Sequence, residues 1–457
     1  MKKLCSCALV FAAGLTPLCA AAADMQPAPG RVFHVAQQHP AAADENDGTA
    51  DRPWKTIGRS LTTLQTGDTL YVHAGVYREM IMLATNGWTF AGITAPPFAG
   101  GRSFAAPVRF LAWPGDEVVI KASEPVTGWR PHAGAVWVKD DWPHNSQQVF
   151  CDEAPLQQIG GTMPALLMEY WCGDYREKQF ADMMPGSFYY DREQKKLFVW
   201  LADGGDPNAH LMEAGVRPFL FTIGVGVDFV VVSGFKMRHA NTSAIVNWPA
   251  VHLNGAHNVL EDCAVTWCDY IAVNLGGHNN TVRHCVLNCN GNAGLCGSGW
   301  GNQLLDTELS HNNTRRWSSG WGAGGMKVIP GAHGWVVSGC IAASNRWSDG
   351  IWFDAYNANI LIQNCILRHN DGAGIHYEIS ERAIIRNNIA YENKGPGIYL
   401  SNSSRSIVLH NLCYRNGMSG IVAHGVNRRG GFSVDPETGF EPACDVIVWG
   451  NILMDNC

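Results

Sequence analysis

Residues 349–380 read DGIWFDAYNANILIQNCILRHNDGAGIHYEIS and contain two similar phrases, GIWFD and GIHYE. The phrases lie 24 residues apart, and each ends in an acid, Asp354 or Glu378. Gly-Ile recurs at 397–398 and 420–421, so the steps along the chain are 24, 23 and 23 residues. A fixed period of this length indicates a repeat protein built from stacked units.

A second column of residues keeps step with the Gly-Ile pairs. Its members are Cys263, Cys285, Thr307, Cys340, Cys365, Asn388 and Asn411. One step, from Thr307 to Cys340, is longer than the others, and this predicts an insertion at 315–325. Asn at one position of successive coils predicts a ladder of side-chain hydrogen bonds, and Cys there suits a small buried filler. We therefore expect these cysteines to be reduced.

Each unit carries short alternating apolar stretches, such as VRHCVL at 282–287 and IQNCIL at 362–367. A period of two with β-branched residues predicts strands, and the Asn, Gly and Asp residues between them predict turns. Units of about 23 residues with two or three short strands each form a parallel β-solenoid, which buries its core only by stacking. A helical or leucine-rich repeat is disfavoured because no apolar period of 3.6 residues is present. The predicted fold class is all-β.

The two ends of the chain have their own features. Residues 1–23 combine a charged start, the apolar run ALVFAAGL and small residues before Asp24, which is typical of a secretory signal peptide. Residues 24–123 are assigned to an N-terminal cap and the first coils; within them WKTIGRSLTTL predicts a short cap helix, and GDTLYVHAGVYRE predicts two strands. The chain stops just after another coil begins, so we expect the solenoid to continue past residue 457.

The repeat is interrupted between about Glu124 and Arg217, where Trp-rich strands and a hairpin-like stretch replace it. We predict an inserted β-rich, sandwich-like subdomain over 124–217 and the main solenoid over 218–457, with a smaller insertion at 427–444.

Composition limits the partners. Charged residues make up only 16% of the chain and the formal net charge is −7, which disfavours nucleic acid and anionic lipid surfaces. No apolar run is long enough for a membrane span. DENDG at 44–48 lacks the spaced ligands of a calcium loop and is interpreted as a turn. We expect an exported, periplasmic or secreted monomer without a cofactor or metal.

Strand alternation assigns faces to the two phrases. If Ile351 and Phe353 point into the core, then Trp352 and Asp354 point out, and His376 and Glu378 do the same one coil later. Lys327 and Tyr399 share the outer column of Trp352 and His376. Because neighbouring rungs lie about 4.8 Å apart, we expect the Asp354 and Glu378 carboxylates at roughly 5 Å, a separation that suits retaining glycoside hydrolysis. Trp352 and Tyr399 are candidates for stacking on sugar rings, and Lys327, His376 and Arg346 for contacting them.

These features together resemble the secreted right-handed β-helix glycoside hydrolases, including retaining β-xylosidases and relatives acting on fucosides or xylans. The resemblance rests on GDTLYVHAGVYRE, GSFYYDREQKKLFVWL, GAGGMK at 322–327, and GIWFD followed by GIHYEIS. It covers most of residues 31–457 and implies that Asp354 is the nucleophile and Glu378 the acid/base, acting on a plant- or algal-type oligo- or polysaccharide.

Two other functions stay open at this point. A polysaccharide lyase or uronate epimerase could use Lys327, His376, Arg346 or Arg382 as base or cation, although no dense Asp cluster for calcium is present in the sequence. A non-catalytic glycan-binding solenoid would leave the Asp354–Glu378 pairing unexplained. Asp349 and Asp371 fall in turns, where Asp is common, and are not assigned a role.

Overall fold

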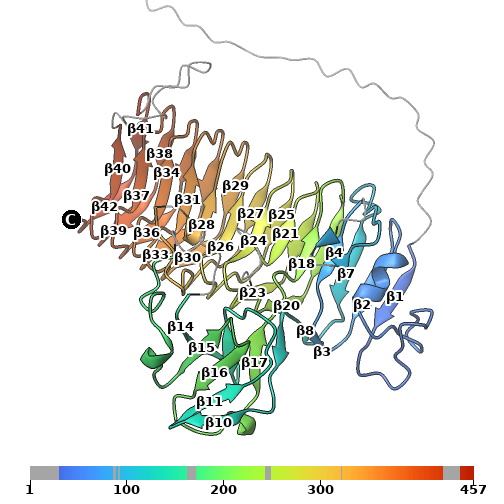
Figure 1. Ribbon diagram of the computed structural model, residues 1–457. Helices are drawn as coiled ribbons and strands as arrows, with labels where there is room; N and C mark the ends of the chain where they lie inside the picture. Colours follow the sequence, from blue (N-terminus) through green and yellow to red (C-terminus); the bar gives the residue numbers. More distant parts are fainter. Residues whose placement is uncertain are drawn as a thin grey trace, which may run out of the picture.

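The computed structural model describes residues 30–85, 89–90, 93–161, 171–241, 249–320, 322–425 and 443–457. The predicted signal peptide and nearly all of the 427–444 insertion lie outside the described residues. Most of the described chain forms a solenoid of stacked parallel strands, with a second β-rich body on one side (Figure 1). No helix among the described residues is long and apolar enough to span a membrane.

Two long parallel sheets run the length of the solenoid. The twelve-stranded sheet consists, in order, of β1 (Val32–Val35), β2 (Thr69–Val72), β7 (Val108–Ala112), β19 (Val230–Ser233), β22 (Val259–Glu261), β25 (Thr281–Arg283), β27 (Gln303–Leu305), β29 (Val336–Ser338), β32 (Leu361–Gln363), β35 (Ile384–Arg386), β38 (Ile407–Leu409) and β41 (Ile447–Trp449). The ten-stranded sheet consists of β4 (Ile81–Leu83), β18 (Phe221–Ile223), β21 (Val251–Leu253), β24 (Ile271–Leu275), β26 (Ala293–Gly297), β28 (Gly324–Val328), β31 (Ile351–Asp354), β34 (Ile375–Glu378), β37 (Ile398–Ser401) and β40 (Ile421–His424).

A third face of the solenoid is formed by two shorter parallel sheets. One contains β3 (Gly75–Tyr77), β8 (Val118–Lys121), β20 (Phe235–Arg238) and β23 (Ala264–Thr266). The other contains β30 (Ile341–Ala343), β33 (Ile366–Arg368), β36 (Ile389–Tyr391), β39 (Leu412–Tyr414) and β42 (Ile452–Met454). Isolated bridges at Val286 and Glu308 connect them. The all-β parallel solenoid predicted from the repeat is therefore confirmed.

Alternation along the strands builds one continuous core inside the solenoid. Ile351, Phe353, Ile375 and Tyr377 belong to it and are fully buried, as predicted. The core residues of successive coils stack because each strand pairs in register with the equivalent strand of the next coil, for example β31 with β34. A shift of one residue would turn every inward side chain to the surface, so the apolar pattern fixes the register.

The predicted ladder of polar side chains is present. Asn388 donates from Nδ2 to Oδ1 of Asn411 at 3.0 Å, and Asn411 donates to Asn451 at 2.9 Å. The column cysteines Cys263, Cys285, Cys340 and Cys365 form no disulfide, which confirms the prediction for them. A second ladder, which the sequence analysis did not identify, joins Asn290, Asn312, Asn345, Asn370, Asn393, Asn416 and Asn456.

The N-terminal cap helix is shorter than its sequence pattern suggested. The segment forms a 3-10 helix, η1 (Gly58–Thr62), and Glu79 fixes its start by accepting hydrogen bonds from the amides of Ile57 and Gly58. Trp54, Ile57 and Leu61 pack into the solenoid core. The next predicted element, GDTLYVHAGVYRE, contains the two expected strands, β2 and β3.

The strands between residues 123 and 215 form two further sheets, and we call residues 124–217 the inserted subdomain. The first sheet has the order β10 (Arg130–Ala133), β11 (Val136–Lys139), β16 (Lys196–Trp200), β15 (Ser187–Asp191) and β14 (Gln157–Ile159). The second has the order β13 (Ala154–Pro155), β12 (Val149–Cys151), β17 (Met212–Gly215) and β9 (Ser123–Pro125). Short 3-10 helices η2 (Phe180–Asp182) and η3 (Pro207–Ala209) and the hairpin of β5 (Thr89–Phe90) and β6 (Ile93–Thr94) complete the elements.

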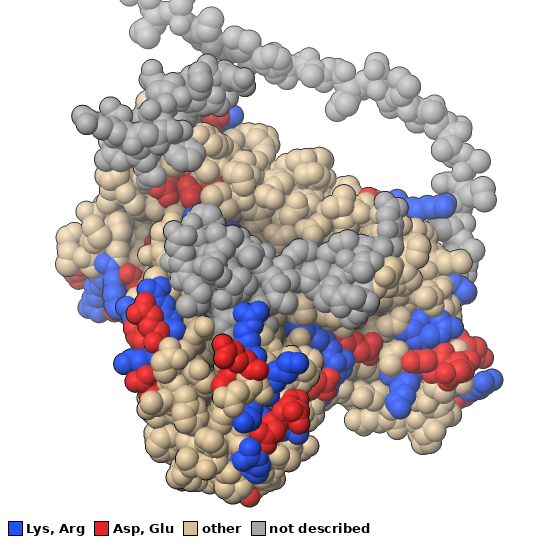
Figure 2. Space-filling model, in the orientation of Figure 1, with Lys and Arg blue, Asp and Glu red and all other residues tan. Residues whose placement is uncertain are grey.

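The two sheets of the inserted subdomain share a core that contains Val149, Phe188, Val199 and Met212. On the face seen in Figure 2, acidic and basic side chains intermingle over this body. Its attachment to the solenoid is a buried charge cluster, in which Glu213 of β17 contacts Lys121 of β8 and Arg78, each at 2.6 Å. A fully buried carboxylate with two cationic partners resists separation, because removing one partner would leave an uncompensated buried charge.

Candidate active site

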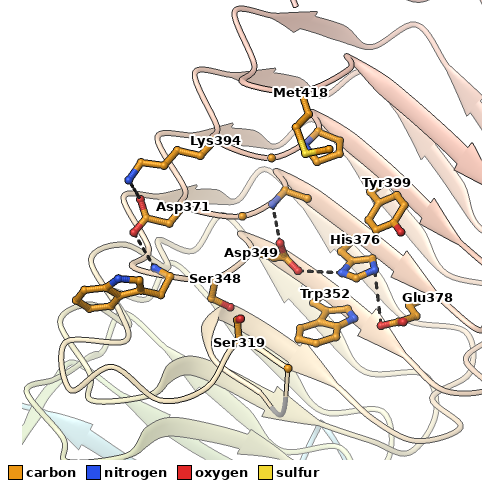
Figure 3. Close-up of a pocket in the computed structure, with 16 residues that line it drawn as sticks. Ser319, Ser348, Asp349, Trp352, Asp371, His376, Glu378, Lys394, Tyr399 and Met418 are labelled. Carbon is orange, nitrogen blue, oxygen red and sulfur yellow. Dashed lines mark hydrogen bonds and ion pairs between the residues drawn. The ribbon is translucent and has the colours of Figure 1, made fainter. Parts of the chain in front are cut away.

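A pocket of about 760 Å³ opens on the outer face of the ten-stranded sheet. It lies beside β31, β34 and β37 and the connections that lead into them (Figure 3). The lining residues are Ser319, Gly320, Trp347, Ser348, Asp349, Trp352, Asp371, Gly372, Ala373, His376, Glu378, Lys394, Gly395, Pro396, Tyr399 and Met418. The volume is in the range typical of small-molecule sites.

The predicted register across the pocket is confirmed. Lys327 pairs with Trp352, Trp352 with His376, and His376 with Tyr399, so the four side chains form one outer column. Asp354 pairs with Glu378 at the ends of β31 and β34. The two acids thus project from adjacent rungs, as the spacing of GIWFD and GIHYE indicated.

A chain of polar contacts crosses the pocket. Oδ2 of Asp349 lies 2.9 Å from Nδ1 of His376, and Nε2 of His376 lies 3.6 Å from Oε2 of Glu378 (Figure 3). The other Asp349 oxygen accepts a hydrogen bond from the amide of Ala373 at 2.6 Å. Asp349 therefore fixes the orientation of the imidazole beside Glu378.

Asp354 has a different environment from Glu378. Its Oδ2 lies 2.9 Å from Nζ of Lys327, whose side chain is buried with 7% of its surface exposed. Asp354 keeps 15% of its side-chain surface exposed and is not among the residues that line the pocket. Lys327 balances the charge of the Asp354 carboxylate and fixes its position at the end of β31.

Trp352 lines the pocket, and its two neighbours in the outer column pack against its ring. Nζ of Lys327 lies 3.4 Å from the centre of its ring, and the His376 ring stacks on it at 5.0 Å. Only 5% of the residue is exposed. Lys327 and His376 both pack against the indole ring. The face of Trp352 is therefore not free to stack on a sugar, and only the edge of the ring can contact a ligand in the pocket. Tyr399, which stacks on His376 at 4.6 Å, is half-buried and lines the pocket.

The predicted substrate-binding residues separate into two groups. Trp352, His376 and Tyr399 line the pocket, whereas Lys327 lies beneath Asp354 and does not. Arg346 is exposed and lines a second cleft, at the junction with the inserted subdomain. Arg346 does not line the first pocket, and its predicted role in substrate binding stays a prediction.

Asp349 and Asp371 were interpreted as ordinary turn residues, but both line the pocket. Asp371 bonds Lys394 at 2.7 Å and accepts the amide of Trp347 at 2.7 Å. A signal for Asp349 was available in the sequence, since later coils place Ala373 and Pro396 at the corresponding position before the Gly-Ile pair. An acid at a position otherwise filled by small or apolar residues marks a departure from the structural repeat.

One cluster among the described residues offers ligand atoms for a metal ion. Cys151, Asp152 and His210, in the inserted subdomain, have these atoms within 4.8 Å of one another. Burial raises the pKa of the Cys151 thiol, and the hydrogen bond to Asp152 raises the pKa of His210. Both shifts oppose the loss of a proton that metal binding requires, and Nδ1 of His210 lies 2.7 Å from Oδ2 of Asp152.

Comparisons with known proteins agree with this architecture. Residues 249–412 and 355–434 match the family described as the right handed beta helix region. A solved structure described as the complex of XylC with xylose is 18% identical, with a TM-score of 0.72, covering 92% of this chain and 75% of that chain. A structure described as a glycoside hydrolase is 10% identical, with a TM-score of 0.62, covering 93% of this chain and 96% of that chain.

A pectate lyase, Pel9A, aligns less well, at 14% identity and a TM-score of 0.40, covering 93% of this chain and 78% of that chain. No curated protein sequence matches the chain. Identities at this level establish the fold and leave the reaction to the site. The chain therefore has the right-handed parallel β-helix fold, and residues 249–434 match the family model of that description.

Proposed function

We propose that the protein is a periplasmic or secreted glycoside hydrolase that cleaves an oligo- or polysaccharide with retention of configuration. Asp354 is the nucleophile and Glu378 the acid/base in this proposal. The observation that carries it is the pairing of the two acids on adjacent rungs, β31 and β34, with Glu378 lining the pocket.

The register of the two acids supports this chemistry, because Asp354 and Glu378 stand on neighbouring rungs. Rungs of a parallel sheet lie about 4.8 Å apart, and retaining glycosidases hold their two carboxyl groups about 5–5.5 Å apart. Inverting enzymes need about 6.5–9.5 Å so that a water molecule fits between the carboxyl groups. In the first step Glu378 would donate a proton to the leaving oxygen while Asp354 attacks the anomeric carbon. In the second step Glu378 would take a proton from the water that releases the sugar.

The surroundings of the two acids support their different roles. Lys327 holds one oxygen of Asp354 and leaves the other for attack. Glu378 lines the pocket and faces His376, which Asp349 orients from the opposite side. A protonated His376 at this distance would favour the ionised form of the Glu378 carboxyl. The two neighbours with the higher TM-scores, a xylose complex and a glycoside hydrolase, are consistent with a sugar substrate.

A lyase or epimerase would need a free base and a cation beside the substrate carboxylate. Lys327 is bound to Asp354 and packed on Trp352. Arg382 pairs with Glu381, and Arg346 lies in the second cleft. Of the four candidate side chains for such a mechanism, Lys327 and Arg382 are therefore already paired with carboxylates, and Arg346 lies outside the pocket. This arrangement favours hydrolysis.

The test is a screen of the purified protein on aryl xylosides, fucosides, arabinosides and galactosides and on plant and algal polysaccharides. Sugar release by the wild type that is lost in both Glu378→Gln and Asp354→Asn supports the proposal. Proton NMR of the first product formed should give the same anomer as the substrate. An unsaturated product that absorbs in the ultraviolet would establish a lyase instead, and binding of glycans without any product would establish a non-catalytic solenoid.

A further inference from the structure

A second cleft, of about 510 Å³, lies where the inserted subdomain meets the solenoid. The subdomain contributes 147–148, residues of β13 and β14, the segment 171–175 and Gly186, and the solenoid contributes Trp267, 314–316 and 346–347. The described lining residues are Gln147, Gln148, Pro155, Leu156, Gln157, Gln158, Trp171, Gly173, Asp174, Tyr175, Gly186, Trp267, Thr314, Arg315, Arg316, Arg346 and Trp347. The mechanism proposed above uses none of the residues that belong to this cleft alone.

The cleft adjoins the catalytic pocket. Trp347 lines both cavities, and the short segment 314–320 contributes Thr314, Arg315 and Arg316 to the cleft and Ser319 and Gly320 to the pocket. The indole of Trp347 is 41% exposed, with the guanidinium of Arg316 over its ring at 4.9 Å. A ligand longer than one sugar can therefore extend from the pocket across Trp347 into the cleft.

The cleft contains a buried polar group that lacks a partner within the described part of the chain. Gln148 is only 8% exposed, and its Oε1 has no hydrogen-bond partner there. A buried acceptor left unsatisfied is costly, so a ligand that donates a hydrogen bond to it gains binding energy. Sugar hydroxyls supply such donors. Tyr175 and Trp267, both half-buried, add the aromatic surface that sugar rings pack on.

The three arginines of the cleft differ in their partners. Arg315 is paired with Asp269 and bonded to Gln158, and Arg316 is paired with Asp174. Arg346 is exposed, and within the described residues no carboxylate lies within ion-pairing distance of it. A guanidinium binds a carboxylate through two parallel hydrogen bonds, so Arg346 is suited to an anionic group on the ligand.

We propose that this cleft is a distal subsite that binds an acidic sugar unit, a uronate, of the substrate. Arg346 binds the carboxylate of this unit, Gln148 accepts a hydroxyl hydrogen bond, and Trp347 carries the chain between the cleft and the pocket. The inference rests on the proposed function only in one respect, namely that the bound saccharide is also the substrate whose glycosidic bond is cleaved. The preference for an acidic ligand is a property of the cleft and can be measured without turnover.

The experiment measures binding by calorimetry with the Glu378→Gln variant, so that the ligand stays intact. The probes are pairs of equal length: glucuronate-substituted and unsubstituted xylo-oligosaccharides, and oligogalacturonates with neutral galacto-oligosaccharides. The acidic member of at least one pair should bind tenfold or more tightly than the neutral member, and the difference should shrink as NaCl is raised. Arg346→Gln, added to Glu378→Gln, should reduce the difference to twofold or less.

Two variants serve as comparisons. Arg192→Gln, in the exposed β15–β16 hairpin of the same subdomain, removes an equal charge outside the cleft and should leave the preference intact. Trp347→Ala should weaken both members of a pair, because it removes the shared surface. Equal affinity for acidic and neutral members, no binding of any probe, or an unchanged preference in Arg346→Gln would overturn the inference.

The binding data and the activity screen can fail independently. If an acidic preference depends on Arg346 while no glycoside is hydrolysed, the subsite stands and the proposed hydrolase function fails. If neutral glycosides are hydrolysed with Glu378 required, but Arg346→Gln affects acidic and neutral ligands equally, the hydrolase stands and the subsite fails.

Discussion

The outer column of the ten-stranded sheet has two halves that share a register and differ in environment. In the N-terminal half, Met82, Thr222 and His252 occupy successive rungs and are 2–4% exposed. In the C-terminal half, His376 and Tyr399 occupy the same column and line a pocket. Both halves follow the same strand alternation, so the difference arises from what lies above the sheet.

The two histidines of the column show the consequence. Burial lowers the pKa of His252 to about 4, so this imidazole is neutral and acts as part of the packing. His376 instead lies between the carboxylates of Asp349 and Glu378. An outward-facing side chain on a solenoid strand is therefore either buried or part of a pocket, depending on the segments that lie over it. Apolar packing covers the first half, for example Met82 with Phe219, and acids from the strand connections surround the second.

The strongest test of this contrast is Glu378→Gln in the open half. Removing the proposed acid/base should lower kcat by about 10²- to 10⁴-fold, the range for general acid–base catalysis. The urea midpoint should stay close to that of the wild type, since the replacement has the same size. Kinetics and urea unfolding are measured on the same preparation. Glu392→Gln, a carboxyl beside His369 on another face, serves as control and should change neither quantity.

The buried half of the column can be tested through His252, whose burial should make the free energy of unfolding depend on pH. The unfolded chain protonates His252 near pH 6.5, whereas the folded protein does so only near pH 4. Between these values only the unfolded state takes up the proton, so stability is complete above pH 6.5 and falls as the pH drops toward 4. The loss should reach about 3 kcal/mol.

The measurement compares the free energy of unfolding at pH 7 and pH 4.5 in the wild type and in His252→Leu. The cost of the substitution itself cancels in the difference between the two pH values. The variant should lose less stability on acidification, while His284→Gln, at an exposed histidine, should behave as the wild type. Equal pH dependence in all three proteins would contradict the assignment of His252 to the neutral, packed half.

Asp349→Asn tests the half of the column that lines the pocket, through the contact between Asp349 and His376. The substitution keeps an oxygen for the amide of Ala373 but removes the charge that faces His376. Hydrogen bonds to charged groups contribute about 1.5–3 kcal/mol, so kcat should fall by about 10- to 100-fold with a smaller change in KM. Asp371→Asn is the matched control, because Asp371 lines the same pocket without contacting His376. An unchanged kcat in Asp349→Asn would show that Asp349 does not act through the imidazole.

Thr222→Val should have the smallest effect, and it should be stabilising. Thr222 is 2% exposed, and its hydroxyl has no hydrogen-bond partner within the described residues. Replacing it with an isosteric apolar residue should raise the free energy of unfolding by about 1 kcal/mol. Urea titration at pH 7 measures this, with Thr266→Val at a half-buried position as reference. Destabilisation by Thr222→Val would mean that the buried half depends on polar contacts after all.

The parts of the site that the sequence predicted are those fixed by the repeat. The 24-residue step between GIWFD and GIHYE was sufficient to place Asp354 beside Glu378 and Trp352 beside His376. The roles that require knowledge of neighbours were harder to predict. Trp352 looked like a sugar platform, but Lys327 and His376 cover its faces. Asp349 looked like a turn residue because it lies in the connection before β31. Its contact with His376 reaches to the next coil, and such a contact between coils is not visible in the sequence around Asp349.

By itself, the sequence determined the solenoid, the inward and outward faces and the order of side chains along each column. It could do so because stacking in register repeats one local pattern, and a slip by one residue would expose the whole core. Only the tertiary structure decided which stretch of a column is open, and that Arg346 serves a different cleft from His376. Those outcomes depend on segments that lie outside the repeat, such as 314–320 and the inserted subdomain, and their packing has no period from which it could be predicted.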